Sequence, residues 1–287
     1  MPVIHLKQAV EDIRRSCVLA ERRSDPCPFF FLVGAGISHP AVPMANAIIA
    51  ECQRETAGVT EPVGLSDMAR YSFWFERAYP SPLDRQEYLR GHIANKWVPL
   101  ANLRLAHLML SGRPSNLTVT VNFDDFLFRA LLAFGSRPVV CDHPETILKI
   151  DLTDRATPQL VHLHGSYQFY DCRNLQGEVS ERAGQNEATP FTMAGFLENL
   201  LSQRAPLVIG YSGWEQDVFM TALRRRLKRP LQNNLYWFCF EEANHHRLPE
   251  DVRNHPNVFA VCPEPAAETA GAEEAAGPAQ ADRKSVV

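Results

Sequence analysis

Residues 29–38 of the chain, FFFLVGAGIS, contain the pattern that decides its fold. The first five are a continuous apolar run, and a run this short and this apolar is typical of a central parallel strand buried on both faces. The glycine-containing segment 34–38 follows, and the pattern after it predicts a helix from about residue 44 to residue 55. A strand, a glycine turn and a helix in this order indicate an α/β fold.

Strand and helix patterns alternate through the rest of the chain. Further apolar runs that predict strands lie at 117–121, 138–141, 159–163, 207–209, 234–240 and 258–261. Helical spacing of apolar residues predicts helices at 5–23, 125–134, 191–204 and 217–227. We therefore expect a Rossmann-like, doubly wound parallel sheet of about six strands with right-handed crossovers.

Two segments depart from this alternation. Residues 56–112 contain no convincing strand, so we interpret them as a helical module inserted into a domain that spans residues 1–262. The aromatic residues expected in the core of this module, with a substrate-facing role as the alternative, are Tyr71, Phe73, Trp74, Phe75, Tyr88 and Trp97. Residues 263–287 are rich in Ala, Glu, Pro and Gly, a composition that predicts a disordered tail or a linker.

Composition excludes several classes of protein. The 287 residues are 45% hydrophobic with a net charge of -4, which gives no reason to expect binding to nucleic acid or to a membrane. The basic run 224–229 is interpreted as the cationic end of a helix. Seven cysteines without a CxxC pair predict neither a disulfide framework nor a metal site. No apolar window is long enough for a signal or a membrane span, so a cytoplasmic location is expected.

Four of the predicted strands end in residues that suit a nucleotide site. These segments are Gly34-Ala-Gly-Ile-Ser38, Asn122-Phe-Asp124, His164-Gly165 and Gly210-Tyr-Ser-Gly213. Ligands of doubly wound sheets bind at the carboxyl ends of the strands. We therefore expect the four segments to line one pocket.

The first two segments offer groups for phosphate and ribose. Gly34 and Gly36 would let a phosphate approach the backbone at the start of a helix. A tight turn is the alternative, because His39 stands where a third glycine would complete the usual motif. Asn122 and Asp124 place an amide and a carboxylate beside the cleft, although Asp124 could instead cap the next helix.

The other two segments offer an acid-base group and a hydroxyl. His164 has the side chain most often used for proton transfer near neutral pH, whereas neighbouring His162 is assigned a structural role. Ser212 can donate a hydrogen bond to a hydroxyl or phosphate, and the alternative is a turn with a helix cap. Tyr211 or Trp214 could cover an adenine or belong to the core.

The order of these four motifs resembles the sirtuin superfamily over residues 28–262. The resemblance implies that NAD is bound, with its pyrophosphate on the first segment. It assigns the nicotinamide-ribose end to Asn122 and Asp124 and the base to His164. The cofactor-binding positions that it implies are Gly34, Ala35, Gly36, Ser38, Asp124, Gly210 and Ser212.

Departures from the deacylase pattern refine this expectation. Ser38 is followed by His-Pro-Ala-Val-Pro-Met in place of a segment with Asp-Phe-Arg, and Phe123 replaces an isoleucine. Two CxxC pairs for zinc are missing, since residues 165–206 contain only Cys172. The pattern is closer to zinc-free bacterial NAD hydrolases of anti-phage defence. This resemblance implies NAD as the substrate, no metal, and a homo-oligomer or a defence partner.

The resulting hypothesis is hydrolysis of NAD to nicotinamide and ADP-ribose, with Asn122 and His164 as catalytic residues. One alternative is a protein deacylase or ADP-ribosyltransferase. Another is a non-catalytic sensor of NAD or ADP-ribose in a defence complex, although a pure binder would not need both of these residues. The sequence leaves open whether the substrate is NAD or NADP and whether the product is linear or cyclic.

Overall fold

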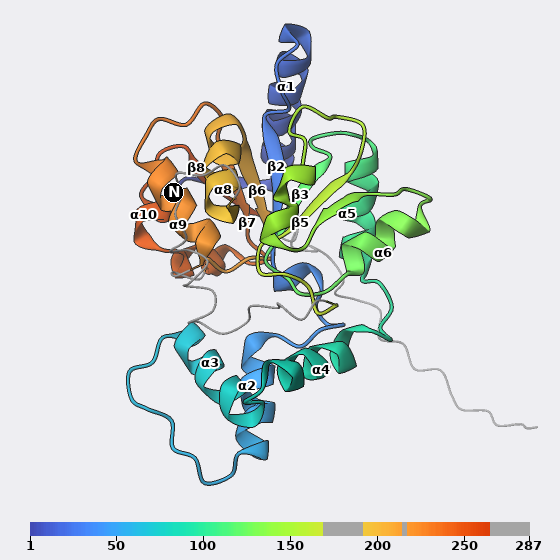
Figure 1. Cartoon of the computed structure of the whole chain (residues 1–287). Helices are drawn as coiled ribbons and strands as arrows, with labels where there is room; N and C mark the ends of the chain where they lie inside the picture. Colours follow the sequence, from blue (N-terminus) through green and yellow to red (C-terminus); the bar gives the residue numbers. More distant parts are fainter. Residues whose placement is uncertain (169–191, 214–216, 265–287) are drawn as a thin grey trace, which may run out of the picture.

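A computed structural model of the chain describes residues 1–168, 192–213 and 217–264. The polar, glycine-containing segment 167–189, which its composition predicts to be a loop, lies mostly outside the described residues. Cys172, Trp214 and nearly all of the predicted tail also lie outside them. The elements that carry the candidate site are all within the described part. Figure 1 shows a central sheet with helices on both faces and a group of three helices below it.

The sheet confirms the predicted α/β class and is entirely parallel. Its order is β1-β8-β7-β6-β2-β3-β5-β4. The strands are β1 (Val3–His5), β2 (Phe29–Val33), β3 (Leu117–Thr120), β4 (Val139–Cys141), β5 (Gln159–His162), β6 (Ala205–Ile209), β7 (Leu235–Phe238) and β8 (Val258–Cys262).

The predicted count of about six strands is wrong, because the described residues form eight. The seven apolar runs predicted as strands correspond to β2 through β8. The strand without a predicted counterpart is β1, which pairs with β8 at one edge of the sheet. Both edge strands, β1 and β4, are only three residues long. Of the residues in β1 only Ile4 is buried, so this strand gives no continuous apolar run from which it could be recognised.

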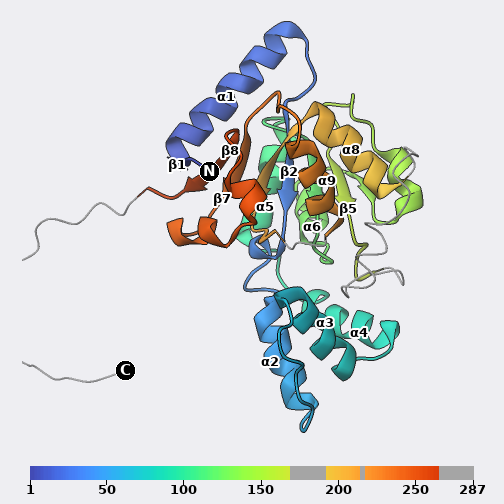
Figure 2. The same cartoon turned by 90° about the vertical axis from the view of Figure 1, so that its left-hand side faces the viewer.

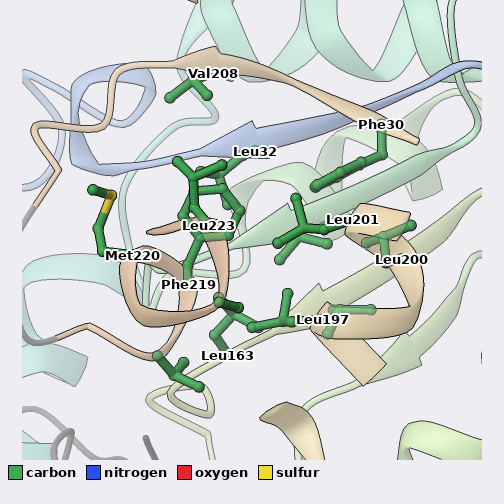
Figure 3. Packing of buried hydrophobic residues seen from close by; sticks show 14 of the residues in the cluster. Phe30, Leu32, Leu163, Leu197, Leu200, Leu201, Val208, Phe219, Met220 and Leu223 are labelled. Atoms are coloured by element: carbon green, nitrogen blue, oxygen red, sulfur yellow. The ribbon is translucent and has the colours of Figure 1, made fainter. Parts of the chain in front are cut away.

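Alternating side chains of β2 build the two halves of the core. Phe30 and Leu32 pack under α8 (Met193–Gln203) and α9 (Val218–Leu227), as Figure 3 shows. Phe29, Phe31 and Val33 face the opposite helical layer. Every residue of β2 is buried, and burial of each large side chain contributes about 1.5–3 kcal/mol. The run that predicted a central strand therefore lies at the centre of the sheet.

The opposite layer consists of α1 (Leu6–Arg23), α5 (Leu100–Leu110) and α6 (Phe126–Ala133). Figure 2 shows α1 running obliquely past the strands at the β1 edge. Shorter helical turns are at Ala35–Ile37, Pro144–Lys149 and Glu242–Arg247, and a short α10 is at Glu250–Arg253. Both faces of the sheet are thus covered, as an all-parallel sheet requires.

Three helices form a separate group: α2 (Ala45–Glu55), α3 (Asp67–Ala78) and α4 (Pro82–Ile93). They lie apart from the sheet in Figures 1 and 2. Tyr71, Trp74 and Phe75 are buried between α2 and α3, as expected for core residues. Trp97 was expected in that core but is 93% exposed, because it lies in the connection between α4 and α5.

Helix α4 brings this group back to the carboxyl edge of the sheet. Leu89 and Ile93 pack against Phe126 and Tyr167, which belong to segments that follow β3 and β5. The Gln86 side chain also donates a hydrogen bond of 2.8 Å to the Tyr167 carbonyl. The helical group therefore borders the edge at which the candidate site lies.

Candidate functional site

The sheet order places the four predicted segments side by side. Strands β6, β2, β3 and β5 are consecutive neighbours, and each precedes one of these segments. From β2 the chain passes to β3 on one side, and it later returns to β6 on the other. This reversal makes the space between β2 and β6 the topological switch point, where open parallel sheets bind their ligands.

The glycines at the switch point fit against each other. The Gly36 N–H donates to the Gly210 carbonyl at 2.9 Å, and the Gly34 N–H donates to Ile209 at 3.0 Å. A Cβ on Gly36 would lie 2.7 Å from the Gly210 Cα, and one on Gly34 would lie 2.7 Å from the Gly210 oxygen. Gly210 also has a φ of +66°, which favours glycine. Mutual packing of the two turns thus requires these glycines.

Part of each turn remains open to a ligand. Ala35, Gly36, Gly210 and Ser212 are exposed. The backbone N–H groups of residues 34 and 36–38 are all used within the protein, whereas that of Ala35 has no acceptor among the described residues. A free N–H at the start of a helical turn is a donor for an anionic group. Tyr211, by contrast, is buried against Trp237 and belongs to the core.

Asn122, Ser38 and Asp124 form one buried network. The Asn122 Nδ2 donates to the Gly34 carbonyl at 3.1 Å and to the Ser38 Oγ at 3.2 Å. The Ser38 hydroxyl in turn donates to the Asp124 Oδ2 at 2.7 Å. Because a carbonyl can only accept, the Gly34 contact fixes which end of the Asn122 amide is nitrogen. Ser38 is 1% exposed, so its hydroxyl serves this network and is not presented to a ligand.

Asp124 makes the contact expected at the start of the next helix and also belongs to the buried network. Its Oδ1 accepts from the Phe126 N–H at 3.2 Å at the start of α6, while its Oδ2 accepts from Ser38. Burial raises the pKa of Asp124 to about 6, and the hydrogen bonds from Ser38 and Phe126 oppose that rise. The carboxyl group therefore titrates close to neutral pH.

The two histidines at the end of β5 have different surroundings. His162 ends β5, and its Nδ1 lies 3.1 Å from the Asn122 carbonyl oxygen. Burial lowers the pKa of His162, against the effect of this hydrogen bond. The buried position and backbone contact agree with a structural role. His164 lies beyond the strand, in a turn completed by Gly165 at a φ of +81°.

His164 is paired with Asp217, the first residue of the predicted helix 217–227 and not one of the predicted site residues. The His164 Nε2 lies 2.9 Å from the Asp217 Oδ1, and both residues are at least 95% buried. Asp217 also accepts hydrogen bonds from the Tyr211 hydroxyl and the Phe219 N–H. Burial alone would raise its pKa, but the charge and hydrogen bond of His164 and the Tyr211 bond lower it overall.

Two hydrogen-bond acceptors remain available at this edge. In the neutral imidazole, with the Nε2 proton directed to Asp217, the Nδ1 of His164 carries the lone pair, and this buried atom has no partner in the described part of the chain. The Asn122 Oδ1 likewise receives no hydrogen bond from the described residues. Both atoms suit an O–H donor, such as a ribose hydroxyl or a water molecule.

No three His, Cys, Asp or Glu side chains in residues 1–168, 192–213 and 217–264 gather as ligands for a metal ion. Among those same residues, no helix is both long and apolar enough to cross a membrane.

Comparison with known families identifies the larger part of the chain. The family model described as a SIR2-like domain matches residues 116–272. This range includes Asn122, Asp124, His164 and Asp217 but not the glycine segment at 34–38. A comparison with curated proteins gave no match.

Proposed function

Because the chain belongs to the SIR2-like domain family, which generally contains NAD-dependent enzymes, we propose that it is an NAD+ glycohydrolase. The observation that carries this proposal is the buried His164–Asp217 pair, which leaves the Nδ1 of His164 unpartnered among the described residues. The pair lies at the same sheet edge as the anchored amide of Asn122. These groups are suited to handling O–H protons beside a bound sugar.

Several exposed groups at the switch point fit the dinucleotide. The Ala35 N–H, which has no acceptor within the described ranges, and the exposed backbone of Gly36 would contact the pyrophosphate. Ser212 would donate to the adenosine side. Asp124 lies further in, and its fixed contact with Ser38 holds Asn122 in place beside the nicotinamide ribose. We assign binding roles to Ala35, Gly36 and Ser212, and positioning roles to Ser38 and Asp124. Asn122 and His164 are assigned catalytic roles.

The reaction breaks the bond between the ribose C1′ and the nicotinamide nitrogen. The bond electrons leave with nicotinamide, the ribose gains oxocarbenium character, and water adds at C1′ to give ADP-ribose and a proton. The Asn122 Oδ1 accepts a hydrogen bond from this water or from a ribose hydroxyl and so orients it. The His164 Nδ1 accepts the proton that the water loses as it adds to C1′, and Asp217 stabilises the resulting imidazolium through Nε2 until that proton passes to solvent.

The biological role that we propose is depletion of NAD by an anti-phage effector in bacteria. The missing Asp-Phe-Arg segment and CxxC pairs support this proposal over deacylation. Uncontrolled hydrolysis would harm the host, so we propose that a homo-oligomer or a partner protein restrains the enzyme. Cellular NAD measured during phage infection tests the role: NAD should fall in cells with the wild-type chain and stay constant with His164→Ala.

The direct test is release of nicotinamide from NAD without any acyl peptide. Wild-type protein should release nicotinamide and ADP-ribose, and folded Asn122→Ala and His164→Ala variants should lose roughly 100-fold or more of this activity. His246→Ala, at a surface position, is the matched control and should retain it. Wild-type protein that binds NAD but never releases nicotinamide, as an oligomer or with its partner, would favour the sensor. Release only with an acyl peptide would favour a deacylase.

A further inference from the structure

Cys239 and Cys262 lie opposite each other at the carboxyl ends of two neighbouring strands. The last paired residues of β7 and β8 are Phe238 and Val261, and the Cys239 N–H donates to the Val261 carbonyl at 2.8 Å. The next position along each chain segment is a cysteine. Neighbouring strands are about 4.7–4.9 Å apart, and the Cα atoms of a disulfide lie about 4.4–6.8 Å apart. The register therefore brings the two cysteine backbones within the range of a disulfide.

The two side chains also lie on the same face of the sheet. Side chains alternate between faces along a strand, so Cys239 shares its face with Leu235 and Trp237, and Cys262 shares its face with Val258. Leu235, Trp237 and Val258 belong to the core cluster beneath α8 and α9, and Cys239 packs against that cluster. A hydrogen bond joins the thiols of the two cysteines. No third His, Cys, Asp or Glu in the described ranges completes a metal-binding group with them, so the pair favours disulfide chemistry.

The two cysteines differ in exposure, which sets the order in which they react. Both occur as thiols, and Cys262 is 3% exposed whereas Cys239 is partly exposed. Burial raises the pKa of Cys239 to about 11, and the charge and hydrogen bond of Cys262 add to that rise. Because the thiolate is the form that attacks a disulfide, the pair reacts slowly at neutral pH and faster in alkaline solution. Cys239 is the thiol that a dissolved oxidant reaches first.

We infer that Cys239 and Cys262 form a reversible disulfide when the chain meets a small-molecule disulfide such as oxidised glutathione. The Cys239 thiolate attacks one sulfur of the oxidant, which forms a mixed disulfide and releases one glutathione thiolate. The Cys262 thiolate then attacks the Cys239 sulfur, closes the protein disulfide and releases the second glutathione thiolate. The protons of the two protein thiols pass through solvent to the two glutathione thiolates. The cysteines lose two electrons, and the oxidant gains them.

Closure of this disulfide acts on the turn that follows β6. Trp237 lies two residues before Cys239, and its Nε1–H donates to the Tyr211 carbonyl in that turn at 3.1 Å. The Cβ atoms of a disulfide lie about 3.5–4.5 Å apart, so closure draws the end of β7 toward β8. Because β7 lies between β8 and β6, this movement takes Trp237 away from the turn that carries Ser212. Weaker NAD binding should follow; this consequence rests on the proposed function, whereas the disulfide itself does not.

Disulfide mapping in the full chain tests the pair directly. Wild-type protein is incubated with oxidised glutathione at about pH 8.5, where thiolate is more abundant, and its remaining thiols are then alkylated. Trypsin cleaves at Arg247 and Arg253, between the two cysteines. The peptides of Cys239 and Cys262 should be recovered linked, and dithiothreitol should separate them. Cys27→Ala, which removes another partly exposed cysteine, is the matched control and should form the same link.

Two mapping results would overturn the disulfide. One is that both thiols are still alkylated after oxidation, and the other is a mixed disulfide on Cys239 that never passes to Cys262.

The effect on the turn is measured separately, as the KM for NAD in nicotinamide release before and after oxidation. Oxidation should raise KM of the wild type by roughly 3–10-fold, the effect of about one lost hydrogen bond. Cys239→Ser should keep the KM of the reduced wild type under both conditions. An unchanged KM in wild type with the linked peptides would contradict the effect on the turn. If neither state releases nicotinamide, only the proposed function fails, and calorimetric NAD binding makes the same comparison.

Discussion

The His164 Nε2 lies 2.9 Å from the Asp217 Oδ1, and the two residues come from opposite sides of the switch point. His164 follows β5, whereas Asp217 precedes α9 beyond β6. The contact therefore spans the crevice at which β6 and β2 meet. This contact selects the tautomer of the neutral imidazole, because the Asp217 carboxylate accepts a hydrogen bond from the N–H at Nε2.

Asp217→Asn should lower kcat for nicotinamide release by roughly 100-fold or more, because an amide no longer stabilises the imidazolium or selects the tautomer. NAD affinity should change little, since Asp217 acts through His164. Steady-state kinetics across pH, with NAD binding measured separately, test this role. Asp251→Asn is the matched control, because its partner Arg224 lies on the surface. If kcat and its pH profile do not change in Asp217→Asn, then Asp217 serves only as the cap of α9 and does not act on His164.

Asp124 should contribute stability at low pH, and the free energy of unfolding should fall as pH rises from about 4 to about 6 and this contribution is lost. Its folded pKa of about 6 exceeds the ordinary value of 3.8, so the folded state holds the proton more tightly. The stabilisation is fully present below the unfolded pKa and is lost as pH passes the folded pKa. A shift of about two pH units corresponds to about 3 kcal/mol in the free energy of unfolding.

Urea denaturation from pH 4.5 to 8 compares wild type with Asp124→Asn. The stability of wild type relative to this variant should decline with rising pH and become constant above about pH 7. Asp151→Asn is the control, because hydrogen bonds from Thr153 lower the pKa of Asp151. A relative stability of Asp124→Asn that does not vary with pH would show that Asp124 keeps an ordinary pKa.

Gly36→Ala should destabilise the protein and weaken NAD binding, since the new Cβ would lie 2.7 Å from the Gly210 Cα. Backbone on both sides must move, at a cost of roughly 1–3 kcal/mol. Gly91→Ala makes the same substitution inside α4, where a Cβ meets nothing within 4 Å, and should stabilise by about 0.5–1 kcal/mol. Thermal denaturation of both variants checks the opposite signs. Equal Tm changes would contradict the interlocking of the two turns.

Ser38→Ala should cost about 1–3 kcal/mol in the free energy of unfolding, because Asp124 and Asn122 each lose a buried partner. The hydrogen bond from Ser38 lowers the pKa of Asp124, so its loss should move the Asp124 titration to higher pH. Nicotinamide release should also fall as Asn122 becomes less fixed. Ser212→Ala, at an exposed position, should leave stability unchanged. A Ser38→Ala variant with wild-type stability would disprove the buried network.

The sequence by itself determined the class of fold and the edge of the sheet at which the candidate site lies. The apolar run 29–33 predicted a central strand because a strand buried on both faces buries all five consecutive apolar side chains. The four predicted site segments directly follow β2, β3, β5 and β6, and a parallel topology brings the carboxyl ends of these strands to one edge of the sheet. The short edge strand β1 escaped prediction because three residues with one buried side chain carry too little pattern.

Only the tertiary structure decided which of these residues contact one another. Local patterns describe neighbours within a few positions, whereas the Ser38–Asp124 and His164–Asp217 contacts join residues 86 and 53 positions apart. Asp217 has the sequence signature of a helix cap, and its second role exists because β5 and β6 bring His164 within hydrogen-bond distance. Gly34 and Gly36 likewise suggest a phosphate loop, but the approach of Gly210 is what requires them. Long-range packing therefore turned separate motifs into one site.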